Sequence, residues 1–170
     1  MAGEEHRKHA VEKVDFCLVV TSTRVYRGEK PDKLTPLVKG LVEGRGHRLA
    51  ASTIVPNDPA QIQEAVGKAV ERCDVVIVTG GTGPSPRDVS IDVVASMAHR
   101  ELPGFGEIFR LLTYQRHGPV AWLSRASAYL VDWRLVAVVP GSSDAVRLAL
   151  EELLLPEAGH LVGELRRRPG

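Results

Sequence analysis

A glycine-rich segment over residues 79–90, with the sequence TGGTGPSPRDVS, carries the residue types best suited to chemistry. Three glycines within 80–83 let the backbone approach a ligand and turn its N–H groups toward an anion. Arg87 suits a bidentate phosphate contact, and the carboxylate of Asp88 suits Mg²⁺. The segment therefore predicts a phosphate site, and the alternative is a tight turn with Asp88 as the N-cap of the helix that follows. The expected binding residues are Thr79, Gly80, Gly81, Thr82 and Gly83.

A second segment of similar design follows the last apolar run, where Pro140-Gly141-Ser142-Ser143-Asp144 leads into a helical pattern. Ser142 or Ser143, taken alone, is most simply a helix cap. Two anion-binding loops at one edge of a sheet suit a substrate with separated phosphate and polar groups, such as a nucleotide with a second phosphorylated molecule. Neither segment contains GxxxxGK[ST] or GxGxxG, which argues against an ordinary P-loop or dinucleotide site.

Other polar residues have simple structural explanations. Glu107 and Arg110 have the i,i+3 spacing of a helical ion pair, while Ser124 and Arg125 fit a cap or an ion pair. His160 is expected to be structural. The six histidines show no spacing typical of a metal site, and the GxSxG segment of a serine hydrolase is absent from the sequence.

Short apolar runs alternate with helical patterns along the chain. Runs at 16–20, 75–78 and 135–139 predict strands buried on both faces, and residues 49–55 predict a weaker strand ending at Pro56. The apolar spacing predicts helices that begin at Asp58-Pro59 and span 88–100 and 143–155, the last stopping before Pro156.

This alternation predicts an α/β fold, a three-layer α/β/α sandwich with a mostly parallel sheet. Residues 104–117 and 120–132 are expected to be insertions before the last strand. Ligands bind beyond the carboxyl ends of the strands in such sheets, and both glycine-containing segments follow strands.

The composition fits one globular domain, expected over residues 15–165, with a polar N-terminal extension at 1–14 and a basic tail at 166–170. Twenty-two Lys and Arg against 21 Asp and Glu give a net charge of +1, which argues against a nucleic-acid partner. The longest apolar runs are far shorter than the roughly 20 residues of a membrane span.

Cysteine usage and the charged N-terminus both point to a cytoplasmic protein. The first residues lack the apolar stretch of a signal peptide. Cys17 and Cys73 are the two cysteines, and they form no CxxC pair. We therefore expect neither a disulfide framework nor a thiolate zinc site.

Taken in order, several segments make the chain similar to the MoaB/MogA family of molybdenum cofactor biosynthesis and to the related G domain of gephyrin. They are VPNDPAQI at 55–62, TGGTGPSPRDVS at 79–90, LPGFGEIFR at 102–110, LSRA at 123–126 and VPGSSDAVRLALEELLLPEAGHL at 139–161. The resemblance covers nearly the whole chain and implies a molybdopterin-binding fold and a homotrimer or homohexamer. It also implies adenylation of molybdopterin by ATP with Mg²⁺, releasing pyrophosphate.

The resemblance assigns roles to individual positions as well. It implies phosphate binding by residues 80–83 and a catalytic role for Asp88. The enzyme hypothesis adds that Asp88 holds Mg²⁺ and that Arg87 or Arg125 offsets developing charge. The other positions that the resemblance places in the pocket are Glu107, Ser124, Arg125, Pro140, Gly141 and Ser142.

Several positions depart from the family pattern. Asn57 stands where an acidic residue is usual, and Asp58 beside it is the expected catalytic substitute. Ser22 replaces a second carboxylate, Leu34-Thr35 replaces a Ser-Gly pair, and Tyr129 replaces a glycine. Two alternatives to the enzyme therefore stay open: a non-catalytic molybdopterin carrier of the same fold, and a nucleotide-processing homologue similar to the N-terminal domain of competence-damage proteins.

Overall fold

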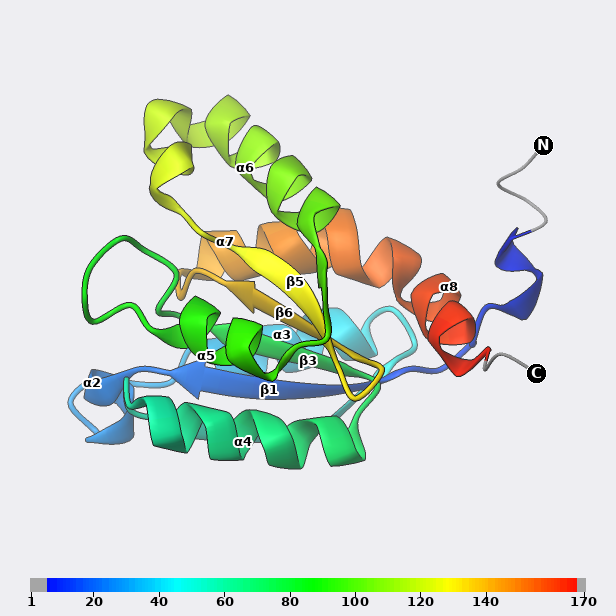
Figure 1. The fold of residues 1–170 in the computed structure, drawn as a ribbon, viewed down its shortest axis with the longest axis horizontal. Helices are drawn as coiled ribbons and strands as arrows, with labels where there is room; N and C mark the ends of the chain where they lie inside the picture. Colours follow the sequence, from blue (N-terminus) through cyan, green and yellow to red (C-terminus); the bar gives the residue numbers. More distant parts are fainter. Residues whose placement is uncertain (1–5, 168–170) are drawn as a thin grey trace.

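The computed structural model describes residues 6–167, in which six strands form one sheet between two layers of helices (Figure 1). The strands are β1 (Asp15–Thr21), β2 (Arg48–Val55), β3 (Val75–Thr79), β4 (Arg100–Leu102), β5 (Ser127–Val131) and β6 (Arg134–Val139). Their order is β2-β1-β3-β6-β5-β4. The first four in this order are parallel, whereas β5 and β4 are antiparallel to their neighbours. The predicted α/β/α sandwich with a mostly parallel sheet is confirmed.

Alternate residues of the central strands pack against different helix layers. Along β1, Phe16, Leu18 and Val20 face one layer, and Cys17 and Val19 face the other. The first layer contains α3 (Leu34–Glu43), α6 (Pro103–His117), α7 (Ser143–Leu148) and α8 (Leu155–Arg166), and the second contains α4 (Pro59–Arg72) and α5 (Ser90–Met97). Burial on both faces explains why these strands are continuously apolar.

Two strands were not predicted: β5 lies inside the expected insertion 120–132, and β4 begins at the last residue of the predicted helix 88–100. β5 is fully buried, but the turn that joins it to β6 lacks the usual glycine or asparagine signal. Asp132 and Trp133 occupy that turn with φ angles of 48° and 58°. β4 has three residues, two of them exposed, and is too short to give a pattern.

The helix after β6 does not stop before Pro156 as predicted. A π-helical segment, η3 (Ala149–Leu154), follows α7 directly and leads into α8, whose first turn contains Pro156. Proline lacks an N–H, so it is tolerated in a first turn, and the wider π turn before it replaces the regular α-helical bonding. Helix α5 is shorter than the predicted 88–100, because Asp88 and Val89 stay in the preceding loop and Arg100 begins β4.

The described parts of both predicted end segments pack against the fold. The short 3₁₀ helix η1 (His6–His9) precedes Val11, whose N–H donates to the carbonyl of Gly159 in α8 at 2.9 Å. A Cβ at Gly159 or Gly163 would meet the backbone carbonyl of Val11 or His9. Arg166, the first residue of the expected basic tail, ends α8 and pairs with Asp74. Residues 1–5 and 168–170 of these predictions lie outside the described residues.

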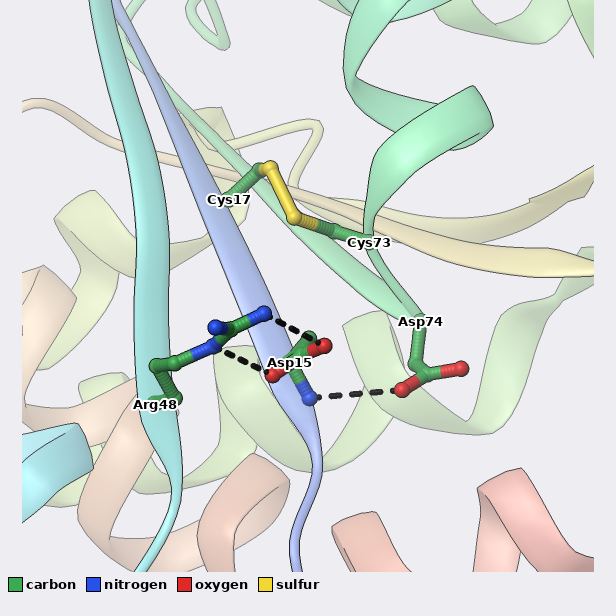
Figure 2. Close-up of a disulfide and its surroundings, with 5 residues drawn as sticks. All are labelled: Asp15, Cys17, Arg48, Cys73 and Asp74. Carbon is green, nitrogen blue, oxygen red and sulfur yellow. Dashed lines mark hydrogen bonds and ion pairs between the residues drawn. A yellow bond between two sulfur atoms is a disulfide. The ribbon is translucent and has the colours of Figure 1, made fainter.

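A disulfide joins Cys17 in β1 to Cys73 at the end of α4, contrary to our expectation (Figure 2). The two cysteines are 56 residues apart, so their spacing carries no local signal. Parallel pairing of β1 with β3 places Cys17 beside Val76, and Cys73 lies two residues before β3 begins. The Cα atoms are therefore 5.8 Å apart, within the usual range for a disulfide.

Candidate functional site

The glycine loop, residues 80–89, leaves the carboxyl end of β3 and meets the ends of β1 and β6 at the left of Figure 1. The N–H of Gly80 donates to the carbonyl of Val139 at 2.8 Å. Gly80 and Gly81 have φ angles of 92° and 69°, which favour glycine. A Cβ at Gly80 would lie 2.5 Å from the carbonyl oxygen of Thr21, and one at Gly81 would meet Ser90 Oγ. Both glycines are therefore required by the protein's own packing.

Three successive N–H groups of this loop, those of Gly81, Thr82 and Gly83, find no acceptor within residues 6–167. Thr79 Oγ1, at the end of β3, is buried and likewise lacks a partner in the described part of the chain. Native proteins rarely leave a buried polar group such as Thr79 Oγ1 unpaired. Successive free amides can bind an anion, so the predicted phosphate-binding residues do lie together.

Asp88 does not cap a helix, so the capping role is wrong, whereas the tight turn of the same alternative is present: the N–H of Asp88 donates to the carbonyl of Ser85 at 2.9 Å. Helix α5 begins at Ser90, and its N-cap, Val89, makes no side-chain bond. Asp88 Oδ2 instead accepts the N–H of Ser85 at 3.1 Å within the loop. A Cβ at Gly83 would lie 2.7 Å from the same oxygen. The carboxylate thus lies directly against the segment with unpaired amides.

A cavity of about 390 Å³, which we call the α6-side pocket, opens on one side of the glycine loop. Its lining includes five predicted residues: Thr82, Gly83, Ser124, Pro140 and Ser142. The wall formed by α6 and the 3₁₀ helix η2 (Gly118–Leu123) is largely apolar, with Phe109, Val120 and Leu123. A pocket with apolar walls and a few polar groups suits a flat ring system.

A second cavity, of about 810 Å³, opens on the other side of the same loop, and we call it the α2-side pocket. Three arginines, Arg24, Arg27 and Arg87, line it together with Glu29. Arg24 belongs to the short helix α2 (Thr23–Tyr26). Ser22 and Asn57, the positions that lack the expected carboxylates, also line this pocket. Its excess of positive charge suits a polyphosphate.

The remaining predicted residues have other positions or partners. Ser142 caps α7 by accepting the N–H of Ala145, and Asp58 caps α4 by accepting the N–H of Gln61 at 2.9 Å. Gly141 lies against Gly80, since its Cβ would be 3.5 Å from that Cα. Glu107 is exposed, lines neither pocket and makes no pair with Arg110.

Arg125 directs its guanidinium at protein atoms. It donates to the carbonyls of Gly83 and Asp88 and forms an ion pair with Asp92 of α5. The hydrogen bond from Arg125 lowers the pKa of the Asp92 carboxyl. Asp92 was not predicted as part of the site, because a single exposed acidic residue in a helix carries no distinguishing signal.

Within residues 6–167, no group of three or more His, Cys, Asp or Glu side chains could hold a metal ion. Magnesium bound to nucleotide phosphates needs only one or two protein carboxylates. Asp88 fits that requirement, since Asp92 is paired with Arg125. Among the helices described, none is long and apolar enough to cross a membrane.

Comparison with known proteins shows extensive similarity. Residues 17–160 match the family described as "Probable molybdopterin binding domain". The chain is 42% identical to molybdenum cofactor biosynthesis protein B of Bacillus anthracis, over 99% of this chain and 100% of the relative. The crystal structure of the tungsten cofactor synthesizing protein MoaB from Pyrococcus furiosus matches with a TM-score of 0.85 and 31% identity, covering 93% of this chain and 100% of that one. A MogA structure matches at TM-score 0.82 and 27% identity, covering 89% and 99%.

Proposed function

We propose that this chain, which belongs to the MoaB family of molybdopterin-binding proteins in molybdenum or tungsten cofactor biosynthesis, adenylates molybdopterin with ATP and Mg²⁺. The observation that carries the proposal is the position of the unpaired amides of residues 81–83. Residues of the glycine loop line both pockets. The helical wall of the α6-side pocket is largely apolar, and the α2-side pocket is rich in arginine. This arrangement suits two phosphate-bearing substrates whose phosphates meet at the loop.

The reaction is a nucleotidyl transfer. An anionic oxygen of the molybdopterin phosphate forms a bond to the α-phosphorus of ATP, the bond from that phosphorus to the bridging oxygen breaks, and pyrophosphate leaves with the electron pair. No proton needs to be removed from the attacking oxygen at neutral pH. The protein's contribution is therefore positioning and charge stabilisation.

Each pocket suits one substrate. The apolar wall of the α6-side pocket, with Phe109 and Leu123, suits the pterin rings. Arg24, Arg27 and Arg87 of the α2-side pocket suit the triphosphate. The amides of residues 81–83 would hold the phosphates between them.

Carboxylates complete the proposed site. Asp88 would hold Mg²⁺, which neutralises phosphate charge when bound. Asp58 is the carboxylate nearest in sequence to Asn57, and its Oδ1 makes no hydrogen bond within residues 6–167. We retain Asp58 as the substitute for the missing acidic residue, because one oxygen can cap α4 while the other contacts a substrate or ion.

The alternative is a carrier that binds molybdopterin without adenylating it. The lining of the α2-side pocket favours it, because Ser22 and Asn57 place neutral side chains where the family pattern has carboxylates. A carrier would keep the α6-side pocket functional and lose the nucleotide reaction.

Self-association as a homotrimer or homohexamer is also proposed. Large apolar side chains are exposed along α6 and η2: Ile108, Leu111, Tyr114, Val120, Trp122 and Leu123. Exposed apolar patches of this kind are typical of interaction surfaces. Light scattering should give three or six times 18.5 kDa, and a stable monomer at micromolar concentration would count against it.

A cytoplasmic location follows from the proposed use of ATP. The Cys17–Cys73 disulfide is unusual for that compartment. Both cysteines are 2% exposed, so burial would shield the bond from soluble reductants.

Incubation of the protein with molybdopterin, ATP and Mg²⁺ tests the proposal. We expect pyrophosphate and adenylylated molybdopterin in equal amounts, with both dependent on Mg²⁺. Molybdopterin binding without either product would establish the carrier instead. The absence of molybdopterin binding would contradict both.

A further inference from the structure

We infer that Arg125 is a positioning residue that holds the glycine loop in shape, and that it does not itself bind phosphate. The inference rests on the proposed function for the identity of the substrates. It replaces the role that the sequence resemblance implies for Arg125, which is a position in the substrate pocket.

The contacts of Arg125 reach along the glycine loop. Its backbone N–H donates to the carbonyl of Thr82 at 2.8 Å. Its side chain donates from Nε to the carbonyl of Gly83 at 3.1 Å and from Nη2 to the carbonyl of Asp88 at 2.8 Å. Residues 84–87 lie between these last two carbonyls. One guanidinium therefore fixes both ends of the turn at residues 84–87, which directly follows the amides of residues 81–83 that find no acceptor within the described residues.

Asp92 of α5 orients this guanidinium. Its two carboxylate oxygens accept from Nη1 and Nη2 of Arg125 at 2.9 and 3.0 Å. The side chains of Arg125 and Asp92 are 39% and 63% exposed, so the ion pair by itself adds little to stability. Its effect is geometric, because a planar guanidinium held at one end by a carboxylate presents its other N–H groups in fixed directions.

The backbone around Arg125 is fixed in turn by α6. Arg110 Nη1 donates to the carbonyl of Ala126 at 2.7 Å and to that of Ser124 at 3.3 Å. A Cβ at Gly106 would meet the same carbonyl of Ala126, so α6 approaches this segment closely. A continuous set of contacts thus runs from α6, through residues 124–126, to the glycine loop.

Arg87 provides the contrast within the same loop. Its side chain is exposed in the α2-side pocket and donates to no acceptor within residues 6–167. The guanidinium of Arg125 has protein partners at each of its three nitrogens. Of the two arginines, Arg87 is therefore the one available to phosphate.

Two variants separate a positioning role from direct phosphate binding. Arg125→Lys keeps the charge but cannot reproduce the forked contacts. Asp92→Asn removes the orienting carboxylate and leaves the guanidinium in place. A positioning role predicts that both variants lower kcat of adenylation, Arg125→Lys by at least about tenfold, with smaller changes in the KM for ATP. If Arg125 instead binds phosphate, Asp92→Asn should not lower kcat. The substitution would free the guanidinium, so the KM for ATP would fall or both constants would stay unchanged.

Arg48→Lys is the matched control. Arg48 forms a forked pair with Asp15, at 2.8 and 3.0 Å (Figure 2). This pair lies at the amino ends of β1 and β2, whereas the glycine loop leaves the carboxyl end of the parallel strand β3. Its replacement removes the same kind of contact and should leave kcat and KM unchanged. Equal losses of kcat in Arg48→Lys and Arg125→Lys would overturn the inference.

Amide hydrogen exchange in the substrate-free protein gives a readout that does not require turnover. The N–H groups of Ser85, Asp88 and Ser90 are hydrogen-bonded within or next to the loop. We expect their exchange to become at least about tenfold faster in Arg125→Lys and to stay unchanged in Arg48→Lys. Unchanged exchange in Arg125→Lys would overturn the positioning role. If the two variants exchange as expected but the wild type does not adenylate molybdopterin, only the proposed function is refuted.

Discussion

The two ends of the sheet use the same residue types in different ways. At the amino ends of β1 and β3, the buried carboxylate of Asp74 accepts from the N–H of Asp15 and from Arg134 and Arg166 at 3.0 to 3.3 Å. At the carboxyl ends, Asp88 accepts a single N–H from Ser85 within residues 6–167. The first aspartate is fully engaged in holding elements together, and the second keeps most of its lone pairs free.

This difference extends to the surrounding groups. The amino ends also contain the Arg48–Asp15 pair and, two residues further along β1, the disulfide of Cys17 (Figure 2). The carboxyl ends contain two cavities and, counting partners within residues 6–167, three unpaired amides and an unpaired arginine at position 87. Polar groups that satisfy one another stabilise the fold, while polar groups left unsatisfied at one edge are available to a ligand.

Loss of the disulfide should have the largest effect on stability and none on chemistry. The bond closes a loop of 56 residues, and the chain-entropy relation for that length gives about 4 kcal/mol. We expect the double variant Cys17→Ala/Cys73→Ala to lose a free energy of unfolding of this order in urea titrations. Its kcat and KM at 25 °C should match those of the wild type, and a selective loss of ATP affinity would link the disulfide end to the site.

Two matched substitutions should affect different properties: Asp88→Asn should lower activity, and Asp74→Asn should lower stability. Asp88→Asn keeps an oxygen for the N–H of Ser85 but weakens Mg²⁺ binding, so adenylation should fall at least about tenfold, equivalent to about 1.4 kcal/mol, with an unchanged Tm. Asp74→Asn weakens charge-assisted hydrogen bonds and should lower the free energy of unfolding by about 2 kcal/mol with normal turnover. Equal adenylation by Asp88→Asn and wild type would show that Asp88 only shapes the loop.

Gly81→Ala should destabilise the fold as well as the site. The φ of 69° at Gly81 costs an L-residue about 1–2 kcal/mol, and the new Cβ would meet Ser90 Oγ. Gly40→Ala in α3 is the control, because nothing lies within 4 Å of its Cβ. That variant should gain about 0.5–1 kcal/mol from helix propensity. Thermal unfolding of both checks the signs, and a stable Gly81→Ala would contradict the observed loop conformation.

A smaller effect should come from His47, near the amino end of β1. Its Nδ1 accepts the N–H of Val14 at 3.1 Å, and burial lowers its pKa below the usual 6.5. The unfolded chain therefore takes up a proton at higher pH than the folded protein. The stabilisation is complete above about pH 6.5 and decreases as the pH falls toward the folded-state pKa. Urea midpoints at pH 7.5 and 5.5 should differ more for the wild type than for His47→Gln, and an equal difference would exclude this contribution.

Much of the fold could be predicted from the sequence because burial determines where apolar residues occur along the chain. The central strands, β1, β3 and β6, are apolar on both faces, and the helix at Pro59–Arg72 begins with an Asp-Pro signal that the structure reproduces. The position of both glycine-containing segments at one edge followed from the parallel topology.

The remaining features depend on contacts between distant residues. The partnership of Cys17 with Cys73, and that of Arg125 with Asp92, arise only once the strands and helices are assembled. Asp88 has the residue type of a cap but lies two residues before α5 begins. Local sequence gives residue types and periods, whereas the use of each polar group is decided by its neighbours in the fold.

The assignment of chemistry to the carboxyl ends of the strands can be tested most directly by following backbone amide resonances of the ¹⁵N-labelled protein. ATP with Mg²⁺, followed by molybdopterin, should shift the N–H signals of Gly81, Thr82 and Gly83, while those of Asp74 and Arg134 stay unchanged. Unshifted signals at Gly81–Gly83 under saturating substrate, or larger shifts at Asp74 and Arg134, would contradict the assignment.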